Sequence, residues 1–236
     1  MCGVEELKQK AGIQACRFVE DGMVLGLGTG STVRYSIIEI ARMIDDEGIE
    51  VSGVPTSEST RELAESLGIP LVSIDQAEEI DLTIDGADEF DTRFDLIKGG
   101  GGALTREKIV ALASRAMVVV ADDTKRVETL GGFDLPIEVD ESMWEAARQR
   151  ISLICPGEVQ LRGGRDSAYV TDNGGNILDC AFGPTIYDPK ALEMELRGVE
   201  GVVEVGLFVG ICDCLLYTSD AADEGLGVDL GGRRII

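Results

Sequence analysis

Short apolar runs and amphipathic stretches alternate along the first half of the chain. The apolar runs are bounded by glycine or polar residues, as buried strands usually are, and they lie at 23–27, 49–55, 71–74, 80–84 and 117–121. The stretches between them have apolar residues at helical spacing and predict helices at 4–19, 31–46, 61–67 and 103–116. This repeated order of strand and helix predicts an α/β fold, in which a mostly parallel sheet has helices on both faces.

The pattern changes after Gly132. Strands are expected at 135–140, 159–162, 168–171 and 176–181, and helices at 143–153 and 188–197. Asp172-Asn-Gly-Gly175 lies between two of these strands and is a strong hairpin signal. Pro189 follows Asp188 and suits the first turn of a helix. This part of the chain therefore predicts a small α+β domain.

The expected domain boundaries follow from this change of pattern. The larger α/β domain is assigned to 1–131 and 203–236, and the small α+β domain inserted into it to 132–202. The apolar run 202–209 is expected to return the chain to the sheet of the larger domain.

Composition narrows the possible chemistry. The 236 residues are 44% hydrophobic and 28% charged, which is typical of a globular protein. The chain contains no histidine, so acid–base chemistry falls to carboxylates, lysines, tyrosines or cysteines. A net charge of −23 opposes binding to nucleic acid, and it requires any phosphate site to have its own local positive potential.

The sequence indicates neither membrane insertion nor secretion. No apolar run approaches the roughly 20 residues of a membrane-spanning helix, and the N-terminus lacks the pattern of a signal peptide. The six cysteines are scattered and form no Cys-x-x-Cys pair. We expect a reduced, cytoplasmic protein, because a chain of this size does not need disulfides.

One segment brings several reactive groups close together in the sequence. Two carboxylates, Asp85 and Asp88, follow an expected strand, and Lys98 precedes four consecutive glycines, Gly99 to Gly102. Glycine permits the main chain to approach a ligand closely, and backbone N–H groups at the start of a helix bind anions. Glu107 then lies about one turn inside the expected helix. These are the parts needed for proton transfer on an anionic substrate.

Each of these groups also has a simpler structural interpretation. Asp85-Gly-Ala-Asp88 is alternatively an ordinary strand-ending turn, and the glycines are alternatively a flexible turn. A metal site that includes Asp91 and Asp95 is a further alternative, although the spacing of a calcium loop is absent. Glu107 is alternatively a solvated glutamate on the surface of its helix.

A second glycine-rich segment, Gly26-Leu-Gly-Thr-Gly-Ser-Thr32, lies between an expected strand and an expected helix. A dinucleotide or adenosyl-methionine loop would be supported by an acidic residue at the end of the next strand, and that residue is absent. A P-loop would need a lysine before Ser31, where the sequence has Gly30. Another interpretation is a small phosphate pocket formed by 29–32. The structural alternative is a tight turn in which Ser31 caps the helix.

Five motifs occur in a fixed order along the chain. They are Gly-Leu-Gly-Thr-Gly-Ser-Thr32, Thr-Ser-Glu-Ser-Thr60, Asp-Gly-Ala-Asp-Glu89, Ile-Lys-Gly-Gly-Gly-Gly-Ala-Leu-Thr-Arg-Glu-Lys108 and Ala-Asp-Asp-Thr-Lys125. In this order and spacing the chain closely resembles ribose-5-phosphate isomerase, type A. The resemblance covers about residues 5 to 210, and the combination of motifs is specific although each motif alone is not.

The resemblance implies a fold, a reaction and an assembly. The fold is a Rossmann-like domain with a small α+β domain, and the assembly is a homodimer or homotetramer. The reaction interconverts ribose 5-phosphate and ribulose 5-phosphate through a cis-enediolate, in the non-oxidative pentose phosphate pathway. No metal and no organic cofactor are implied.

The resemblance also implies roles for individual residues. It makes Glu107 the catalytic base, and it leaves ring opening to Asp85 or Asp88. Lys98, or the N–H groups of the glycine turn, would stabilise the enediolate oxygen. The residues placed at the substrate are Lys8, Thr29, Gly30, Ser31, Thr32, Asp85, Gly86, Ala87, Asp88, Lys98, Gly99, Gly100, Gly101 and Lys125.

Two other function classes remain open at this stage. A non-catalytic sugar-phosphate sensor would share the fold, but it should carry a basic DNA-binding stretch that this sequence lacks. An adenosyl-methionine-dependent transferase would explain Gly26 to Gly30, but not the segment from Lys98 to Glu107.

The segment from Cys212 onward departs from the family, which continues with an Ala-Asp-Val-like strand and a Gly-Thr turn. It is either a stretch foreign to the gene or a genuine, unusual C-terminal strand. The first interpretation predicts that a chain cut after Asp213 keeps its activity. A cut after Gly201 should instead prevent folding, because it removes the strand 202–209.

Overall fold

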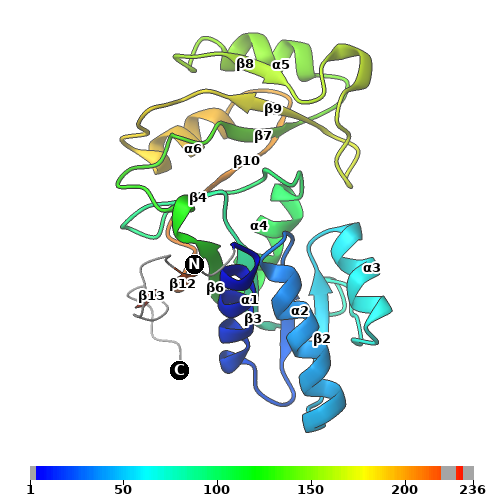
Figure 1. Ribbon diagram of the computed structural model, residues 1–236. Helices are drawn as coiled ribbons and strands as arrows, with labels where there is room; N and C mark the ends of the chain where they lie inside the picture. The colour runs from blue at the N-terminus through cyan, green and yellow to red at the C-terminus, as the bar shows by residue number, and fades with distance from the viewer. Residues whose placement is uncertain (1–3, 219–226, 231–236) are drawn as a thin grey trace. The chain divides into compact units, whose positions relative to one another are not determined.

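The computed structural model describes residues 4–218 and 227–230, and the chain divides into two compact units (Figure 1). The first unit consists of Met1–Ala87, Arg106–Lys125 and Ile211–Ile236. The second unit consists of Asp88–Thr105 and Arg126–Gly210. The chain therefore passes from one unit to the other four times.

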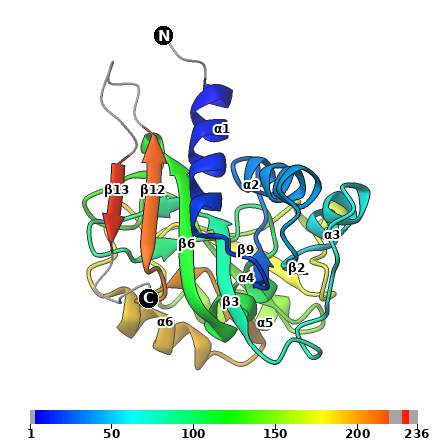
Figure 2. The ribbon, with the colours of Figure 1, turned by 90° about the horizontal axis from the view of Figure 1, so that it is seen from below.

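The first unit is built on a six-stranded sheet in the order β13-β12-β6-β3-β1-β2 (Figure 2). The strands are β1 (Val24–Leu27), β2 (Ser52–Pro55), β3 (Ile80–Gly86), β6 (Ser114–Asp122), β12 (Cys214–Thr218) and β13 (Gly227–Leu230). All neighbouring pairs are parallel except β12 and β13, which are antiparallel. The predicted mostly parallel α/β sheet is confirmed.

Helices pack on both faces of this sheet. They are α1 (Val4–Ala15), α2 (Val33–Arg42), α3 (Glu58–Ser66) and α4 (Leu104–Ala113). The same unit has two short 3-10 helices, η1 (Cys16–Phe18) and η3 (Asp123–Lys125), and one π-helix, η2 (Met43–Glu47). Leu25 and Leu27 of β1 contribute to the core formed with α1 and α2. The side-chain position of Gly26 faces the opposite side of the sheet, where an added Cβ would meet Val110 of α4. Alternate residues of one strand thus serve the two faces, as the pleat requires.

The second unit contains two antiparallel sheets. A four-stranded sheet has the order β10-β7-β9-β8, and a three-stranded sheet has the order β11-β5-β4. Its elements are β4 (Glu89–Phe90), β5 (Leu96–Ile97), β7 (Leu135–Val139), β8 (Val159–Leu161), β9 (Asn176–Cys180), β10 (Val202–Val205), β11 (Leu207–Phe208), α5 (Trp144–Ile151), α6 (Pro189–Arg197) and η4 (Arg165–Ser167). Asp188 caps α6 by accepting from the Ala191 N–H, and Pro189 occupies its first turn, as predicted.

The expectation that 202–209 rejoins the main sheet is wrong. β10 pairs with β7, and β11 pairs with β5, so both lie in sheets of the second unit. The apolar pattern of this run identifies buried strands correctly, but it carries no information about which strand is the partner.

Two other predicted strands are reduced to single bridges. In 71–74 only Leu71 forms a bridge, to Gly53. In 168–171 only Val170 forms a bridge, to Asn176.

The compact units also differ from the predicted domain boundaries. The segments 88–105, 126–131 and 203–210 all belong to the second unit, although each was assigned to the larger domain. The reason is strand pairing, because β4, β5 and β11 form a small sheet of their own and do not join the parallel one.

The C-terminal segment contributes a strand to the core of the first unit. β12 pairs with β6 along its whole length, and Asp213 both donates its N–H to Met117 O and accepts from Met117 N–H, each at 2.9 Å. Cys214, Leu215 and Leu216 are at most 2% exposed. These contacts argue against the expectation that a cut after Asp213 is harmless, because the cut would remove buried side chains. The segments 219–226 and 231–236, which that expectation also covered, lie outside the described residues.

Five cysteines lie in the described part of the chain, and all are buried free thiols: Cys16, Cys155, Cys180, Cys212 and Cys214. Burial raises the pKa of Cys16 to about 12. No helix among the described residues combines the length and the apolar character needed to cross a membrane.

We expect the thermal midpoint of the protein to rise between low and molar potassium chloride. A net charge of −23 makes the folded surface repel itself, and salt screens this repulsion, since the Debye length is about 10 Å at 0.1 M. Differential scanning fluorimetry at increasing salt measures the effect. A midpoint that is flat or falls over this range would refute the surface-repulsion argument.

Candidate active site

The predicted site residues divide between the two units. The first unit holds Lys8, Thr29, Gly30, Ser31, Thr32, Asp85, Gly86, Ala87, Glu107 and Lys125. The second unit holds Asp88, Lys98, Gly99, Gly100 and Gly101. The two groups follow each other directly along the chain at Ala87–Asp88 and at Thr105–Arg106.

In the first unit, two neighbouring strands bring Thr29 and Asp85 together. β1 and β3 are parallel, with Leu27 opposite Ile84, so the residues that follow them meet at one edge of the sheet. The buried Asp85 carboxylate accepts from Thr29 N–H at 3.1 Å and from Gly86 N–H at 2.7 Å, both at Oδ1. The carboxylate is thereby fixed by backbone donors on both strands.

Gly28 is required for this arrangement, because a Cβ at this position would lie 2.3 Å from Asp85 Oδ1 and 2.6 Å from Asp85 Cα. If Asp85 acts on the substrate, as the sequence predicts, Gly28→Ala should lower kcat by roughly 10²-fold, because a shift of about 1 Å in a reacting group costs that much. Steady-state kinetics on the purified variant measure the effect. Gly198→Ala is the matched control, because Gly198 is exposed, has helical backbone angles, and an added Cβ would come no closer than 3.3 Å to another atom, Glu195 O. Equal kcat for the two variants would contradict the role of Gly28.

A cluster of hydroxyl groups surrounds Thr29. Its Oγ1 lies 2.8 Å from Thr56 Oγ1, 2.8 Å from Ser57 Oγ and 3.2 Å from Thr60 Oγ1. Thr60 Oγ1 also donates to Gly28 O at 2.9 Å. The sequence predicted a helix only from residue 61, whereas α3 begins at Glu58 and Ser57 caps it. Its contribution to the position of Thr29 was missed, because local patterns do not predict contacts between separate loops.

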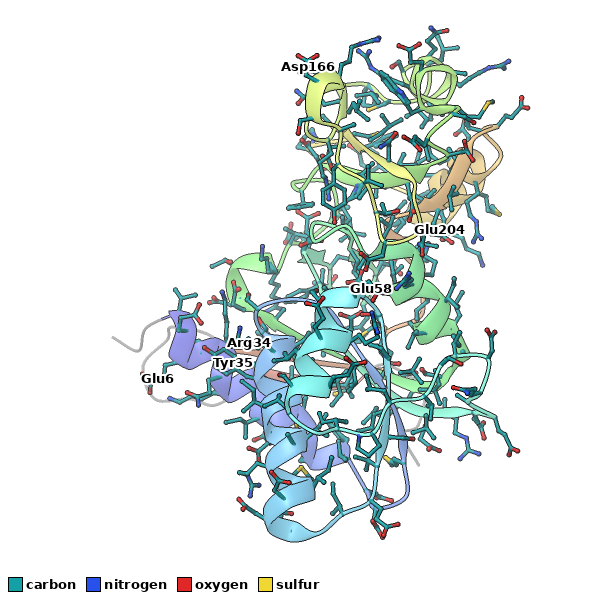
Figure 3. All side chains as sticks on the ribbon, turned by 90° about the vertical axis from the view of Figure 1, so that its right-hand side faces the viewer. Glu6, Arg34, Tyr35, Glu58, Asp166 and Glu204 are labelled. Carbon is teal, nitrogen blue, oxygen red and sulfur yellow. The ribbon has the colours of Figure 1, made fainter. Side chains whose placement is uncertain are left out.

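The glycine-rich loop leads directly into α2. Its N-cap is Thr32, which makes no side-chain capping bond, so the alternative in which Ser31 caps the helix is wrong. Gly30 and Ser31 are exposed. Figure 3 shows Arg34 and Tyr35 on the first turn of this helix. The exposed loop at a helix N-terminus has the features of an anion site.

Lys8 lies near that same helix end. Its Nζ is 3.2 Å from Glu5 Oε1, and Tyr35 Oη donates to Glu5 Oε2 at 2.8 Å. These two hydrogen bonds, Tyr35 first, lower the pKa of the Glu5 carboxyl. Lys125 ends the turn η3 that follows β6 and is half-buried.

Glu107 is buried in the first turn of α4, with 4% of its surface exposed. The alternative of a solvated helical glutamate is therefore wrong. Arg106 beside it donates to Glu58 at 2.8 Å, and this bond holds the pKa of the Glu58 carboxyl below its usual value. Figure 3 shows Glu58 at the start of α3. The ion pair ties the first turns of α3 and α4 together.

In the second unit, Asp88 is joined to the glycine turn. Its N–H donates to Ile97 O at 2.9 Å, and its Oδ2 accepts from Gly100 N–H at 2.6 Å. A Cβ on Gly100 would lie 2.5 Å from Asp88 Oδ1, so the close approach needs glycine. Gly99 and Gly102 have φ of +106° and +85°, which L side chains rarely adopt. The glycines form a defined turn rather than a flexible one.

Lys98 is buried beside this turn, with 2% of its surface exposed. Its N–H donates to Gly206 O at 2.9 Å, which links it to the chain just before β11. Its Nζ lies 5.5 Å from the centroid of the Phe208 ring. A buried ammonium acts in a medium of low dielectric, where it stabilises a nearby negative charge more strongly than at the surface.

The alternative of a metal site at Asp91 and Asp95 finds no support. Asp91 accepts from the Arg93 and Asp95 N–H groups and from the Arg93 guanidinium, and Asp95 accepts from Gly210 N–H. Both carboxylates thus stabilise a turn. In the stretches 4–218 and 227–230, no three His, Cys, Asp or Glu side chains are grouped as a metal ion would need.

The chain matches one protein family over residues 52–221, described as ribose 5-phosphate isomerase A (phosphoriboisomerase A). A curated relative, ribose-5-phosphate isomerase A of Agrobacterium fabrum, is 49% identical over 225 residues, which cover 93% of this chain and 95% of the relative.

Solved structures give the same result. Ribose 5-phosphate isomerase A of Methanocaldococcus jannaschii superposes with a TM-score of 0.88 at 37% identity, over 97% of this chain and 100% of that one. A D-ribose-5-phosphate isomerase in complex with phospho-erythronic acid superposes with a TM-score of 0.90 at 38% identity, over 97% and 99% of the two chains.

Proposed function

The chain belongs to the ribose 5-phosphate isomerase A family, and from this premise we propose how its residues interconvert ribose 5-phosphate and ribulose 5-phosphate. The aldose and the ketose differ by one proton, which moves between C2 and C1. A cis-enediolate intermediate lets a single base on one face of the sugar serve both carbons. Negative charge develops on the enediolate oxygen while the proton is on the base.

Glu107 is the base. This assignment rests on the burial of Glu107. Its side chain lies in the first turn of α4, directly after the glycine turn, and is only 4% exposed. Burying a carboxylate is costly, so a glutamate in this position calls for a functional reason. A carboxylate takes the proton from C2 and returns it to C1, or the reverse.

Asp85 and Asp88 are the candidates for ring opening, which needs an acid and a base at the ring oxygen and the C1 hydroxyl. Asp85 is fixed through Oδ1 by Thr29 and Gly86, and Asp88 through Oδ2 by Gly100. Each carboxylate is therefore held in one orientation by backbone donors. Catalysis benefits from this, because a reacting group that is already oriented lowers the barrier.

Lys98 and the Gly101 N–H of the glycine turn stabilise the enediolate oxygen, while the Gly100 N–H holds Asp88. Preorganised donors and cations are most effective where charge appears only in the transition state. The burial of Lys98 and the defined geometry of the glycines support this role.

The phosphate binds at the loop Thr29 to Thr32, with Lys8 and Lys125 as the nearby cations. The exposed loop at the N-terminus of α2 supports this assignment, and so does Glu5, which contacts both Lys8 and Tyr35 of α2. A chain with a net charge of −23 needs such local positive potential to attract a sugar phosphate. Phospho-erythronic acid, the ligand of one solved relative, is therefore expected to compete with the substrate.

A coupled assay tests the activity. Purified protein that has been treated with EDTA should convert ribose 5-phosphate to ribulose 5-phosphate without added metal, and phospho-erythronic acid should inhibit competitively. Activity that disappears with EDTA and returns with a divalent cation would contradict the metal-free mechanism. No turnover under either condition would contradict the function itself.

Three further proposals come from the family resemblance. The protein acts in the non-oxidative pentose phosphate pathway, it is cytoplasmic, and it forms a homodimer or homotetramer. Complementation of a bacterial strain that lacks this isomerase tests the pathway, cell fractionation tests the location, and light scattering after size exclusion tests the assembly.

A further inference from the structure

The carbonyl oxygens of the glycine turn are held by side chains from a distant part of the second unit. Arg162 follows β8, and its Nη1 donates to Gly99 O at 3.0 Å and to Gly100 O at 3.1 Å. Tyr169 Oη donates to Gly101 O at 3.3 Å. Three consecutive carbonyls thus accept hydrogen bonds from two side chains.

Arg162 is itself held in one orientation. Asp179 on the neighbouring strand β9 binds it through two parallel hydrogen bonds, Nε to Oδ2 at 2.9 Å and Nη2 to Oδ1 at 2.5 Å. Such a two-bond pair fixes the plane of the guanidinium. The Arg162 N–H also donates to Ile177 O at 2.9 Å, and its guanidinium carbon lies 5.8 Å from the centre of the Tyr169 ring.

The bonds from Arg162 to the carbonyl oxygens also determine where the following backbone N–H groups point. In a planar trans peptide the C=O and the following N–H point in opposite directions. Holding Gly99 O therefore directs the Gly100 N–H away from Arg162, and this N–H donates to Asp88 at 2.6 Å. The bond from Arg162 to Gly100 O likewise directs the Gly101 N–H away from Arg162, to the face of the turn on which Asp88 lies.

We propose that Arg162, oriented by Asp179 and assisted by Tyr169, is a positioning residue that orients two N–H groups of the glycine turn: that of Gly100 toward the Asp88 carboxylate and that of Gly101 toward the reacting sugar. This inference rests on the proposed function, because it assigns the Gly101 N–H to the enediolate oxygen and the Asp88 carboxylate to ring opening. Asp179 neutralises the guanidinium charge, so Arg162 acts through the geometry of the turn and not through a long-range field.

Replacing Arg162 with glutamine removes the Nη1 group that donates to both carbonyls. We expect Arg162→Gln to lower kcat by roughly 10- to 100-fold, the range for loss of alignment at a reacting centre, with KM within about threefold of wild type. Hydrogen exchange of backbone amides in the segment 98–104, followed by mass spectrometry, should accelerate. Tyr169→Phe should change kcat less, because it removes one long hydrogen bond.

Arg165→Gln is the matched control. Arg165 lies in the same segment and forms an ion pair with Glu145, but its side chain is 66% exposed and contacts Trp144 rather than the turn. This variant should keep the wild-type kcat and the wild-type exchange rate at 98–104. Should Arg162→Gln fail to fold, Asp179→Asn provides the second test, since it loosens the same guanidinium and should lower kcat in the same direction.

The outcomes separate this inference from the proposed function. An inactive wild-type protein defeats the proposed function, and the exchange measurement still decides whether Arg162 orders the turn. An active enzyme whose Arg162→Gln variant matches Arg165→Gln in kcat overturns the positioning role. A loss of kcat without faster exchange at 98–104 overturns it as well, because the effect would not pass through the turn.

Discussion

Replacing Glu107 with glutamine is expected to lower kcat by roughly 10²–10⁴-fold with a modest change in KM. Glutamine keeps the shape and much of the hydrogen bonding of glutamate, but it cannot accept a proton. In the proposed mechanism binding rests on contacts to the phosphate and the hydroxyl groups of the sugar, so the ground state should change little. Initial rates with ribose 5-phosphate over a range of concentrations give both parameters.

Two further variants set the scale for this result. Glu65→Gln changes an exposed glutamate of α3 that pairs only loosely with Arg61, at 3.5 Å, and it should leave turnover unchanged. Lys98→Ala should impair kcat and KM together, because in the proposed mechanism its ammonium would contact both the bound sugar and the enediolate. If the glutamine variant at 107 turns over at the wild-type rate, Glu107 is not the base, and the role would pass to Asp85 or Asp88.

A chain cut after Asp213 is expected to lose most of its folded, soluble protein. The cut removes β12, whose Leu215 and Leu216 are buried next to β6. Full burial of one leucine side chain is worth about 1.5–3 kcal/mol, and a typical domain is stable by only about 5–15 kcal/mol. The exposed edge of β6 would also favour aggregation. Soluble yield and thermal midpoint measure the loss.

A cut after Thr218 is the control for this truncation. It keeps β12 complete and removes β13, which forms the edge of the sheet. The chain cut after Thr218 should be less stable than the full chain but markedly more stable than the chain cut after Asp213. Equal midpoints for the two truncated chains would show that β12 contributes nothing to the core.

The sequence predicted elements better than their pairing. The run 80–84 was expected as a strand and forms β3, and Asp188-Pro189 was expected to open a helix and begins α6. Periodicity and capping are local properties, so they are visible in the sequence. The partners of β10 and β11 were missed, because pairing depends on residues far away in the chain.

The same distinction holds for the site. Glycine motifs and the carboxylates beside them were identified from their order in the sequence, and the burial of Glu107 and Lys98 agrees with a functional interpretation. Arg162 and Tyr169 were not identified, because they contact the turn from more than sixty residues away in the sequence. An arginine after a short strand has no distinguishing local pattern. Only the folded second unit relates it to Gly99 and Gly100.

Proton exchange with solvent is the most direct test of Glu107 as the base that moves the proton between C2 and C1. During turnover in D₂O, a carboxylic acid that holds the substrate proton exchanges it before returning it, so deuterium should enter C2 of ribose 5-phosphate and C1 of ribulose 5-phosphate. Nuclear magnetic resonance of the sugar phosphates detects the label. The wild-type protein should incorporate deuterium at both carbons, and Glu107→Gln should not. Incorporation by the glutamine variant at the wild-type rate would contradict the mechanism.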